Sequence, residues 1–271
     1  MNELPFLKMH GLGNDFVIID QRKLQINLNK ELICRIANRQ RGVGCDQVAI
    51  ILKNPQTDAE LVFFNSDGST STTCGNATRC IARHLMQDLH KSKLTLTTGN
   101  KILTAKDLGQ GLISVNMGNP EMEWNNIPIS EEIDTLKLPI EGSPTATGMG
   151  NPHCTFFVDD VDQIDLENLG PKFENHPLFP EKTNVQFASA LGSSHLRARV
   201  WERGVGITLS SGSSSCAVLV AAVRNNLTKK KVVVDLDGGQ LEINWQSDGV
   251  WMTGETAHSF NGHLTEEFLK I

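Results

Sequence analysis

Two short stretches of the chain place a small nucleophilic residue where a loop enters a helix. In the first, a turn-rich segment, Asn65 to Thr73, follows an apolar run and leads into Cys74-Gly75-Asn76. The helical pattern after it carries an apolar stripe of Cys80, Ile81, Leu85 and Met86. A helix start offers unpaired backbone N–H groups and the positive end of a dipole, which favour a thiolate and attract anions. Cys74 is therefore a candidate acid–base residue, the alternative being a buried cysteine beside a helix cap.

The second stretch repeats the first at a fixed distance along the chain. Residues 200–223 again read as a strand end, a Gly-rich loop, a small-residue turn and an apolar helix. Ser211-Gly212-Ser213 stands where Cys74-Gly75-Asn76 stood, 137 residues later. The same offset of 137 residues relates three further polar pairs, Asn14 with Asn151, Gln47 with Asn184, and Asn65 with Glu202. The pattern indicates a tandem duplication and predicts two similar α/β halves, each a sheet with a helix entered through the Cys or Ser loop.

Strand and turn patterns surround these two helices. A further helix is predicted over 30–39, with Asn29 placed to cap its start. The Pro-containing segment 118–144 is the best candidate for a boundary between the halves. Short strands are predicted at 16–20, 48–52, 61–64, 94–98, 102–105, 113–117, 154–158, 183–187, 196–201, 232–235, 241–245 and 249–253.

The composition excludes several classes of function. The net charge is −6 and no Lys/Arg-rich stripe appears, which argues against nucleic acid as the main partner. No apolar run is long enough to span a bilayer, and the first residues lack the pattern of a signal peptide. The six cysteines form no Cys-x-x-Cys pair, so a disulfide scaffold is not expected. We therefore predict a cytoplasmic protein without a membrane partner.

The duplication itself points to a kind of chemistry. Two pseudo-equivalent halves generate a cleft at their junction, and each half brings to it a helix start that could hold a small carboxylate. Each also brings one nucleophilic residue, Cys74 or Ser211. One such residue on each face of a substrate suits inversion of a carbon centre, because one group removes a proton while the other delivers one. No Gly-x-Gly-x-x-Gly opens a helix and there is no P-loop or evident pyridoxal-type Lys, so neither a cofactor nor a metal is predicted.

The motifs of the chain resemble those of the diaminopimelate epimerase family. The resemblance runs from Pro5 to the C-terminal region, with the motifs in the same order. The motifs are His10-Gly11-Leu12-Gly13-Asn14-Asp15-Phe16, Asn65-Ser66-Asp67-Gly68-Ser69, Cys74-Gly75-Asn76 with Arg79-Cys80, Gly150-Asn151-Pro152-His153-Cys154, and Trp201-Glu202-Arg203-Gly204. The resemblance implies a cofactor-independent epimerase that interconverts LL- and meso-diaminopimelate for lysine and peptidoglycan supply.

The resemblance also implies an architecture. It predicts an α/β (α+β) protein with two pseudo-symmetric domains, each a curved mixed sheet wrapped round a central helix. The last strand is expected to return to the first domain. The predicted domains are therefore residues 1–118 with about 260–271, and residues 119–259. A homodimer is expected as well.

The same resemblance assigns roles to individual residues. Cys74 matches one of two catalytic thiols, and His153 and Glu202 are expected to assist proton movement, the alternatives being a packed histidine and a structural ion pair. Gly75, Asn76, Gly212 and Ser213 match the cradle for the α-carboxylate. The positions matching substrate contacts are Asn14, Gln47, Asn65, Asn151, Asn184, Glu202 and Arg203. Arg203 is suited to grip the distal carboxylate, and Glu202 to accept from an ammonium group.

One position departs from the family pattern. The second catalytic thiol is expected at position 211, where this chain has a serine, whose hydroxyl is a poor base unless another group activates it. Three explanations are open: an engineered Cys→Ser variant, a natural member with shifted chemistry, and an impaired or non-catalytic homologue. Ile207 replaces a Glu common in relatives, and Cys216 is expected to be a packed helix residue. The rival functions are a related amino-acid racemase or dehydratase and a protein that binds an amino acid without turning it over.

Overall fold

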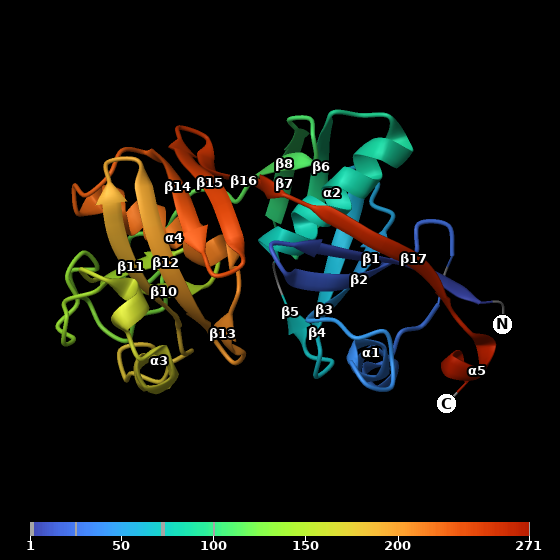
Figure 1. The fold of residues 1–271 in the computed structure, drawn as a ribbon, viewed down its shortest axis with the longest axis horizontal. Helices are drawn as coiled ribbons and strands as arrows, with labels where there is room; N and C mark the ends of the chain where they lie inside the picture. Colours follow the sequence, from blue (N-terminus) through green and yellow to red (C-terminus); the bar gives the residue numbers. More distant parts are fainter. Residues whose placement is uncertain (1–2, 25, 72–73, 100, 271) are drawn as a thin grey trace. The chain divides into compact units, whose positions relative to one another are not determined.

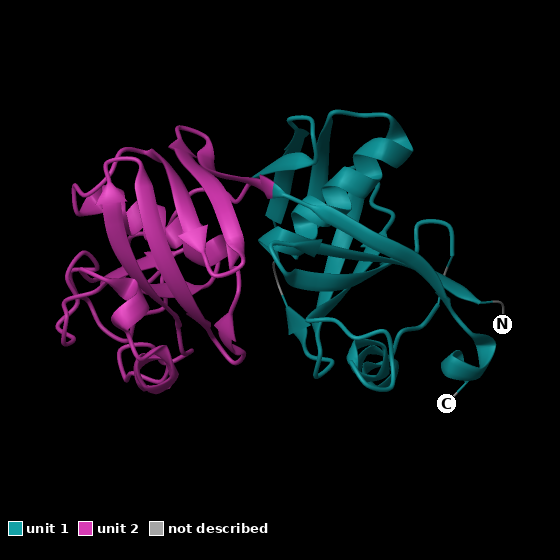
Figure 2. Ribbon diagram, viewed as in Figure 1, with its two compact units in different colours: residues 1–115, 255–271 teal, residues 116–254 magenta. Residues whose placement is uncertain are grey.

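The chain divides into two compact units in a computed structural model that describes residues 3–24, 26–71, 74–99 and 101–270. Unit 1 comprises residues 1–115 and 255–271, and unit 2 comprises residues 116–254 (Figure 2). The boundaries predicted after residue 118 and near residue 260 lie a few residues away. Thr72 and Thr73, which end the predicted turn segment, lie outside the described residues.

Unit 1 is a mixed sheet with two long helices (Figure 1). Hydrogen-bonded neighbours follow the order β17–β1–β2–β3–β4–β6–β7–β8, and only the pairs β2/β3 and β4/β6 are parallel. The elements are β1 (Leu4–Gly11), β2 (Asn14–Asp20), α1 (Lys30–Ala37), β3 (Gln47–Leu52), β4 (Ala59–Asn65), β5 (Thr70–Ser71), α2 (Gly75–Leu89), β6 (Lys93–Thr98), β7 (Lys101–Asp107), β8 (Leu112–Asn116), β17 (Ala257–Leu264) and α5 (Glu266–Leu269).

Unit 2 repeats this arrangement. Its neighbours follow the order β9–β10–β11–β12–β14–β15–β16, and the parallel pairs are β10/β11 and β12/β14. The elements are β9 (Thr145–Gly148), β10 (Pro152–Phe157), the 3-10 turn η1 (Val161–Gln163), α3 (Leu166–Glu174), β11 (Asn184–Gly192), β12 (His195–Glu202), β13 (Gly206–Thr208), α4 (Gly212–Arg224), β14 (Lys231–Leu236), β15 (Gly239–Gln246) and β16 (Gly249–Glu255).

The parallel pairs explain where the helices lie. Parallel strands cannot be joined by a tight hairpin and need a crossover connection, usually a helix. In unit 1 the crossovers are α1, between β2 and β3, and α2, between β4 and β6. In unit 2 the crossovers are α3 and α4. The predicted pair of α/β halves, each with a mixed sheet round a central helix, is confirmed.

The central helices α2 and α4 form the cores of their units. The predicted apolar stripe of α2 is buried, and α2 packs against β1, β2, β6 and β7. Every residue of α4 from Ser214 to Ala222 is buried, as expected for a helix that is apolar nearly all round and contacts strands on several sides. Figure 1 shows each helix enclosed by the strands of its own unit.

Each predicted strand overlaps a strand of the structure, but β1, β5, β9 and β13 were not predicted. The helix predicted over 30–39 begins at Lys30 with Asn29 as its N-cap. It ends at Ala37 because the Asn38 side chain accepts from the backbone N–H groups of Gln40 and Arg41 in a turn. The helix α3 was not predicted, although its Phe173 stacks in the core of unit 2 against Phe156. No helix in the described residues is long and apolar enough to cross a membrane.

Candidate active site

The first candidate acid–base residue caps a helix. Cys74 has extended backbone angles and is the N-cap of α2, where its sulfur accepts from the N–H of Ala77 at 3.4 Å. The hydroxyl of Thr78 donates to the Cys74 carbonyl at 2.8 Å. Gly75 and Asn76, the predicted carboxylate cradle, are buried in the first turn. A partly buried thiol at the positive end of a helix is a setting that favours the thiolate.

The second candidate occupies the same place in unit 2. Ser211 is the N-cap of α4, with extended backbone angles like those of Cys74, and is buried. The hydroxyl of Ser215 donates to the Ser211 carbonyl at 2.8 Å, repeating the contact of Thr78 137 residues later. The Ser211 side chain makes no capping hydrogen bond, so its hydroxyl is not committed to the helix. Gly212 is buried and Ser213 half-buried in the following turn.

Cys34 is partly buried like Cys74, whereas the other four thiols are buried. Burial raises the pKa of Cys45 to about 11 and that of Cys80 to about 12, and it raises the pKa of Cys154 further. A buried thiol without a cationic partner stays protonated and inert. Cys216 is fully buried within α4, as predicted for a packed helix residue.

In unit 1, predicted substrate contacts gather at one edge of the sheet. The parallel strands β2 and β3 start at this edge, the antiparallel strand β4 ends there, and Gln47 lies opposite Asn65 in the register. The amide of Gln47 donates to Asn65 Oδ1 at 2.9 Å, and Asn65 donates to Ser69 at 3.0 Å. The Gln47 Oε1 atom is buried and accepts no hydrogen bond among the described residues. Buried acceptors are normally paired, so this oxygen is available to a ligand donor.

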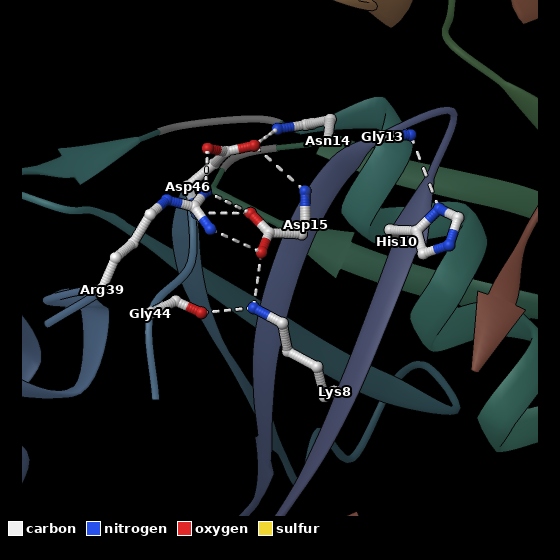
Figure 3. A network of polar contacts seen from close by, with 8 residues as sticks. All are labelled: Lys8, His10, Gly13, Asn14, Asp15, Arg39, Gly44 and Asp46. Atoms are coloured by element: carbon white, nitrogen blue, oxygen red, sulfur yellow. Dashed lines mark hydrogen bonds and ion pairs between the residues drawn. The ribbon is translucent and has the colours of Figure 1, made fainter. Parts of the chain in front are cut away.

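Asn14 is held from the surface of unit 1. Its Nδ2 donates to Asp46 at 2.8 Å, and its Oδ1 accepts from Asn76 at 3.2 Å, which connects it to the first turn of α2. Asp46 also accepts from Arg39 at 2.7 Å, and Arg39 forms two hydrogen bonds with Asp15 (Figure 3). Burial alone would raise the pKa of Asp15, but the hydrogen bonds from Arg39 and Lys8 lower it to about 2. The Asp15 carboxylate is therefore charged, and the hydrogen bond to Asp46 fixes the orientation of the Asn14 amide.

In unit 2, Asn184 connects the start of β10 to the turn after β12. Its Nδ2 donates to the Pro152 carbonyl at 2.9 Å, and its Oδ1 accepts from the backbone N–H of Arg203 at 3.0 Å. The Arg203 guanidinium donates to the Glu181 carbonyl at 2.9 Å. Both groups of Asn184 are thus engaged with backbone, which leaves one amide N–H for a ligand and gives the residue a structural role that the sequence did not predict.

Glu174 supports the turn that carries Glu202 and Arg203, and sequence reasoning missed it. The carboxylate is buried at the end of α3 and accepts from the Trp201 indole at 2.7 Å and from the Gly204 N–H at 3.0 Å. Trp201 in turn packs so closely on α3 that a Cβ added at Gly170 would lie 2.4 Å from its ring. The signal in the sequence was weak, because α3 contains Pro171 and was not recognised as a helix.

His153 is fully buried and engaged at both ring nitrogens. Its Nε2 lies 2.8 Å from Asn151 Oδ1, and its Nδ1 lies 3.0 Å from Gln186 Nε2. Burial, together with the charge of Arg203, lowers the pKa of His153 to about 3, so the ring is neutral. A neutral ring with both nitrogens occupied favours the packed-histidine alternative, and assistance to proton movement stays a prediction.

Comparisons with known proteins relate the sequence and the fold of this chain to one family. A family model described as Diaminopimelate epimerase matches residues 6–123 and 145–259. The chain is 44% identical to the diaminopimelate epimerase of Rhodospirillum centenum, over 97% of this chain and 93% of that one. It is 45% identical to that of Acidiphilium cryptum, over 98% of each.

Solved structures share the fold at low sequence identity. A hydroxyproline epimerase from Agrobacterium vitis superposes with a TM-score of 0.72 at 13% identity, over 98% of this chain and 94% of that one. A predicted epimerase from Pseudomonas aeruginosa gives 0.69 at 15% identity, over 96% and 99%. These likenesses show the fold alone, whereas the sequence matches extend across both units. The chain therefore belongs to the diaminopimelate epimerase family.

Proposed function

We propose that this chain is an isomerase scaffold for the interconversion of LL- and meso-2,6-diaminopimelate by two-base proton transfer at Cα, without pyridoxal phosphate. The observation that carries the proposal is the pair of matched helix starts, with Cys74 as the N-cap of α2 and Ser211 as the N-cap of α4. In the complete reaction one acid–base group takes the Cα proton and its counterpart delivers a proton to the opposite face. The product would serve lysine and peptidoglycan precursor supply.

In the proposed site, backbone groups and side chains bind different parts of the substrate. Backbone N–H groups of the helix starts would hold the α-carboxylate and stabilise the negative charge that develops when Cα loses its proton. Arg203 would bind the distal carboxylate, and Glu202 and the free Gln47 Oε1 would accept from ammonium groups. The remaining proposed contacts are Asn14, Asn65, Asn76, Asn151, Asn184, Gly75, Gly212 and Ser213.

Because of Ser211, we expect this chain to catalyse epimerisation only weakly. A hydroxyl has no appreciable fraction of the alkoxide at neutral pH, so Ser211 is a poor base unless another group activates it. Whether the serine is engineered, marks shifted chemistry or marks an impaired homologue, the expected consequence is one working acid–base residue, Cys74. The same observation favours a second candidate function, a protein that binds diaminopimelate without turning it over.

The experiment is incubation with LL-diaminopimelate in D₂O, followed by NMR of the Cα–H signal and of the meso isomer. Meso product would support the epimerase and show that Ser211 or a substitute works as the second group. Loss of the Cα–H signal without meso product would indicate that Cys74 exchanges a proton on one face alone. The Cys74→Ala variant is the control and should abolish either reaction. Binding without exchange would favour the second candidate, and no binding by calorimetry would refute the proposal.

Two further properties belong to the proposal. We expect a homodimer from the family resemblance. We expect a cytoplasmic location because the six cysteines do not suggest a disulfide scaffold, which favours a reducing compartment. The only ligand class proposed is a small amino acid, with no nucleic acid or membrane partner. Light scattering coupled to size exclusion tests the dimer, and a monomer mass at micromolar concentration would contradict it.

A further inference from the structure

Unit 2 buries a chain of polar side chains directly behind the first turn of α4. The hydroxyl of Thr155 donates to Gln186 Oε1 at 3.1 Å, and Gln186 Nε2 lies 3.0 Å from His153 Nδ1 and 3.1 Å from Ser214 Oγ. The last link joins His153 Nε2 to Asn151 Oδ1. His153, Thr155, Gln186 and Ser214 are all completely buried. Gln186 is the centre of this network, because it contacts Thr155, His153 and Ser214.

The structure gives this hydrogen-bond network a direction. The amide oxygen of Gln186 accepts from the Thr155 hydroxyl, and the amide nitrogen, a pure donor, faces His153 and Ser214. His153 Nδ1 must therefore accept, and the proton of the neutral ring must be on Nε2. The Nε2–H then donates to Asn151 Oδ1. The amide oxygen of Asn151 is thereby occupied from the core side, and its Nδ2 is left to donate elsewhere.

The fold does not require these polar side chains. The parallel pair β10/β11 has the register of β2/β3 shifted by 137 residues, with Thr155 opposite Gln186 as Ile18 is opposite Ala49. The positions of His153 and Ser214 correspond in the same way to Phe16 and Ala77, and all four unit 1 residues are buried. Burying polar groups is costly unless each is hydrogen-bonded, so the polar set in unit 2 needs another explanation than packing.

We propose that Gln186 is a positioning residue that fixes the Nε2–H tautomer of His153 and, through it, turns the Asn151 amide so that it offers N–H and not oxygen to the bound amino acid. Its hydrogen bond to Ser214 connects the first turn of α4 to the same hydrogen-bond network. The part that concerns the ligand rests on the proposed function, whereas the tautomer of His153 does not.

The tautomer is tested first, by long-range ¹H–¹⁵N correlation spectra of the ¹⁵N-histidine-labelled chain, with His153 assigned by loss of its signals in His153→Asn. We expect a protonated Nε2 and an unprotonated Nδ1. In Gln186→Glu the carboxylate cannot donate, so Nδ1 should become protonated. Thr155→Val should give mixed tautomers, while Thr155→Ser, which keeps the hydroxyl, should match the parent. A protonated Nδ1 in the parent, or an unchanged ring in Gln186→Glu, would overturn the proposal.

The orientation of Asn151 is tested by binding of meso-diaminopimelate. Gln186→Leu removes the donor to His153, and we expect binding to weaken about tenfold, the effect of one lost hydrogen bond, with Thr155→Ser unchanged. Because Gln186→Leu could unfold, Gln186→Glu is measured beside it and thermal melting is recorded for both. A parent that shows the expected tautomer but binds no diaminopimelate would refute the proposed function alone. Equal affinity in the parent and in a folded Gln186 variant would refute the role of Gln186 toward the ligand.

Discussion

Asn14 and Asn151 stand at equivalent places in the two units, yet each unit holds its asparagine in a different way. Unit 1 orients Asn14 through the buried Asn76 on one side and, on the other, through Asp46, which the exposed Arg39 contacts. Unit 2 orients Asn151 from inside, through His153 and Gln186, with neutral groups and no water contact. The same backbone position in the two units is thus supported by different side chains. The charged support of unit 1 is expected to respond to salt, and the histidine-containing support of unit 2 to pH.

The largest expected effect comes from making the two helix starts chemically alike. Ser211→Cys places a thiol at both N-caps, and we expect epimerisation of LL-diaminopimelate to rise by about 10²–10⁴-fold, the usual contribution of a positioned acid–base group. The assay is formation of the meso isomer. Ser210→Cys, one residue earlier in a buried loop, is the matched control and should not raise the rate. A negligible rate in Ser211→Cys would show that the rest of the site is not intact.

A large effect is also expected at Arg203, which has no counterpart in unit 1, where the repeat pairs it with Ser66. Arg203→Ala removes the proposed partner of the distal carboxylate and should weaken diaminopimelate binding by about 2–5 kcal/mol. Calorimetry measures the change. Arg199→Ala is the control, because Arg199 lies on β12, the strand that precedes the turn of Arg203, donates to the Ile164 carbonyl and has no proposed ligand contact. Unaltered affinity in Arg203→Ala would remove Arg203 from the site.

The buried support of unit 2 should appear in the pH dependence of stability. Folded His153 stays neutral down to about pH 3, whereas an unfolded histidine binds a proton near pH 6.5, so the unfolded chain takes up the extra proton. The contribution of neutral His153 to the free energy of unfolding is complete above pH 6.5 and is lost as the pH falls toward 3. Each pH unit in this window should reduce the free energy of unfolding by about 1.4 kcal/mol relative to His153→Phe, which copies Phe16 of unit 1. Urea unfolding of the parent and of His153→Phe at pH 6 and pH 5 measures this. An equal change in the free energy of unfolding in both proteins would contradict the prediction.

The smallest effect is expected for the exposed support of unit 1. Arg39 is more than half exposed, so Arg39→Ala should lower the free energy of unfolding by less than about 1 kcal/mol, and less still at high salt. Urea unfolding at two salt concentrations measures the difference. Lys101→Ala, an exposed residue with no described ion pair, gives the baseline. A loss as large as that of a buried group would mean that the two supports are not opposite in character.

The sequence predicted the two helix starts and the polar residues that the repeat pairs, and it missed α3, Glu174 and Gln186. The constant offset located both helix starts, and Asn29 marked the beginning of α1. Gln186 escaped because the repeat pairs it with Ala49, so a search for matching polar landmarks could not find it. Glu174 escaped because Gly170-Pro171 hid the helix α3. Hydrogen bonds between distant strands depend on register and burial, which residue patterns do not specify.

One feature of unit 1 bears on how the chain is made. Strand β1 pairs with β17, so that Leu4 lies opposite Leu264. A ribosome must therefore deliver the whole of unit 2 before the first strand of unit 1 receives its second neighbour. Until then one edge of β1 exposes unpaired backbone groups to other nascent chains.

The same pairing places β1, the first strand, beside β17, the last strand. A short linker between them and new ends cut in a surface loop would give a circular permutant in which β17 is synthesised directly before β1. Unit 1 could then close before unit 2 emerges. The order of synthesis, and not the final set of contacts, is what such a rearrangement would change.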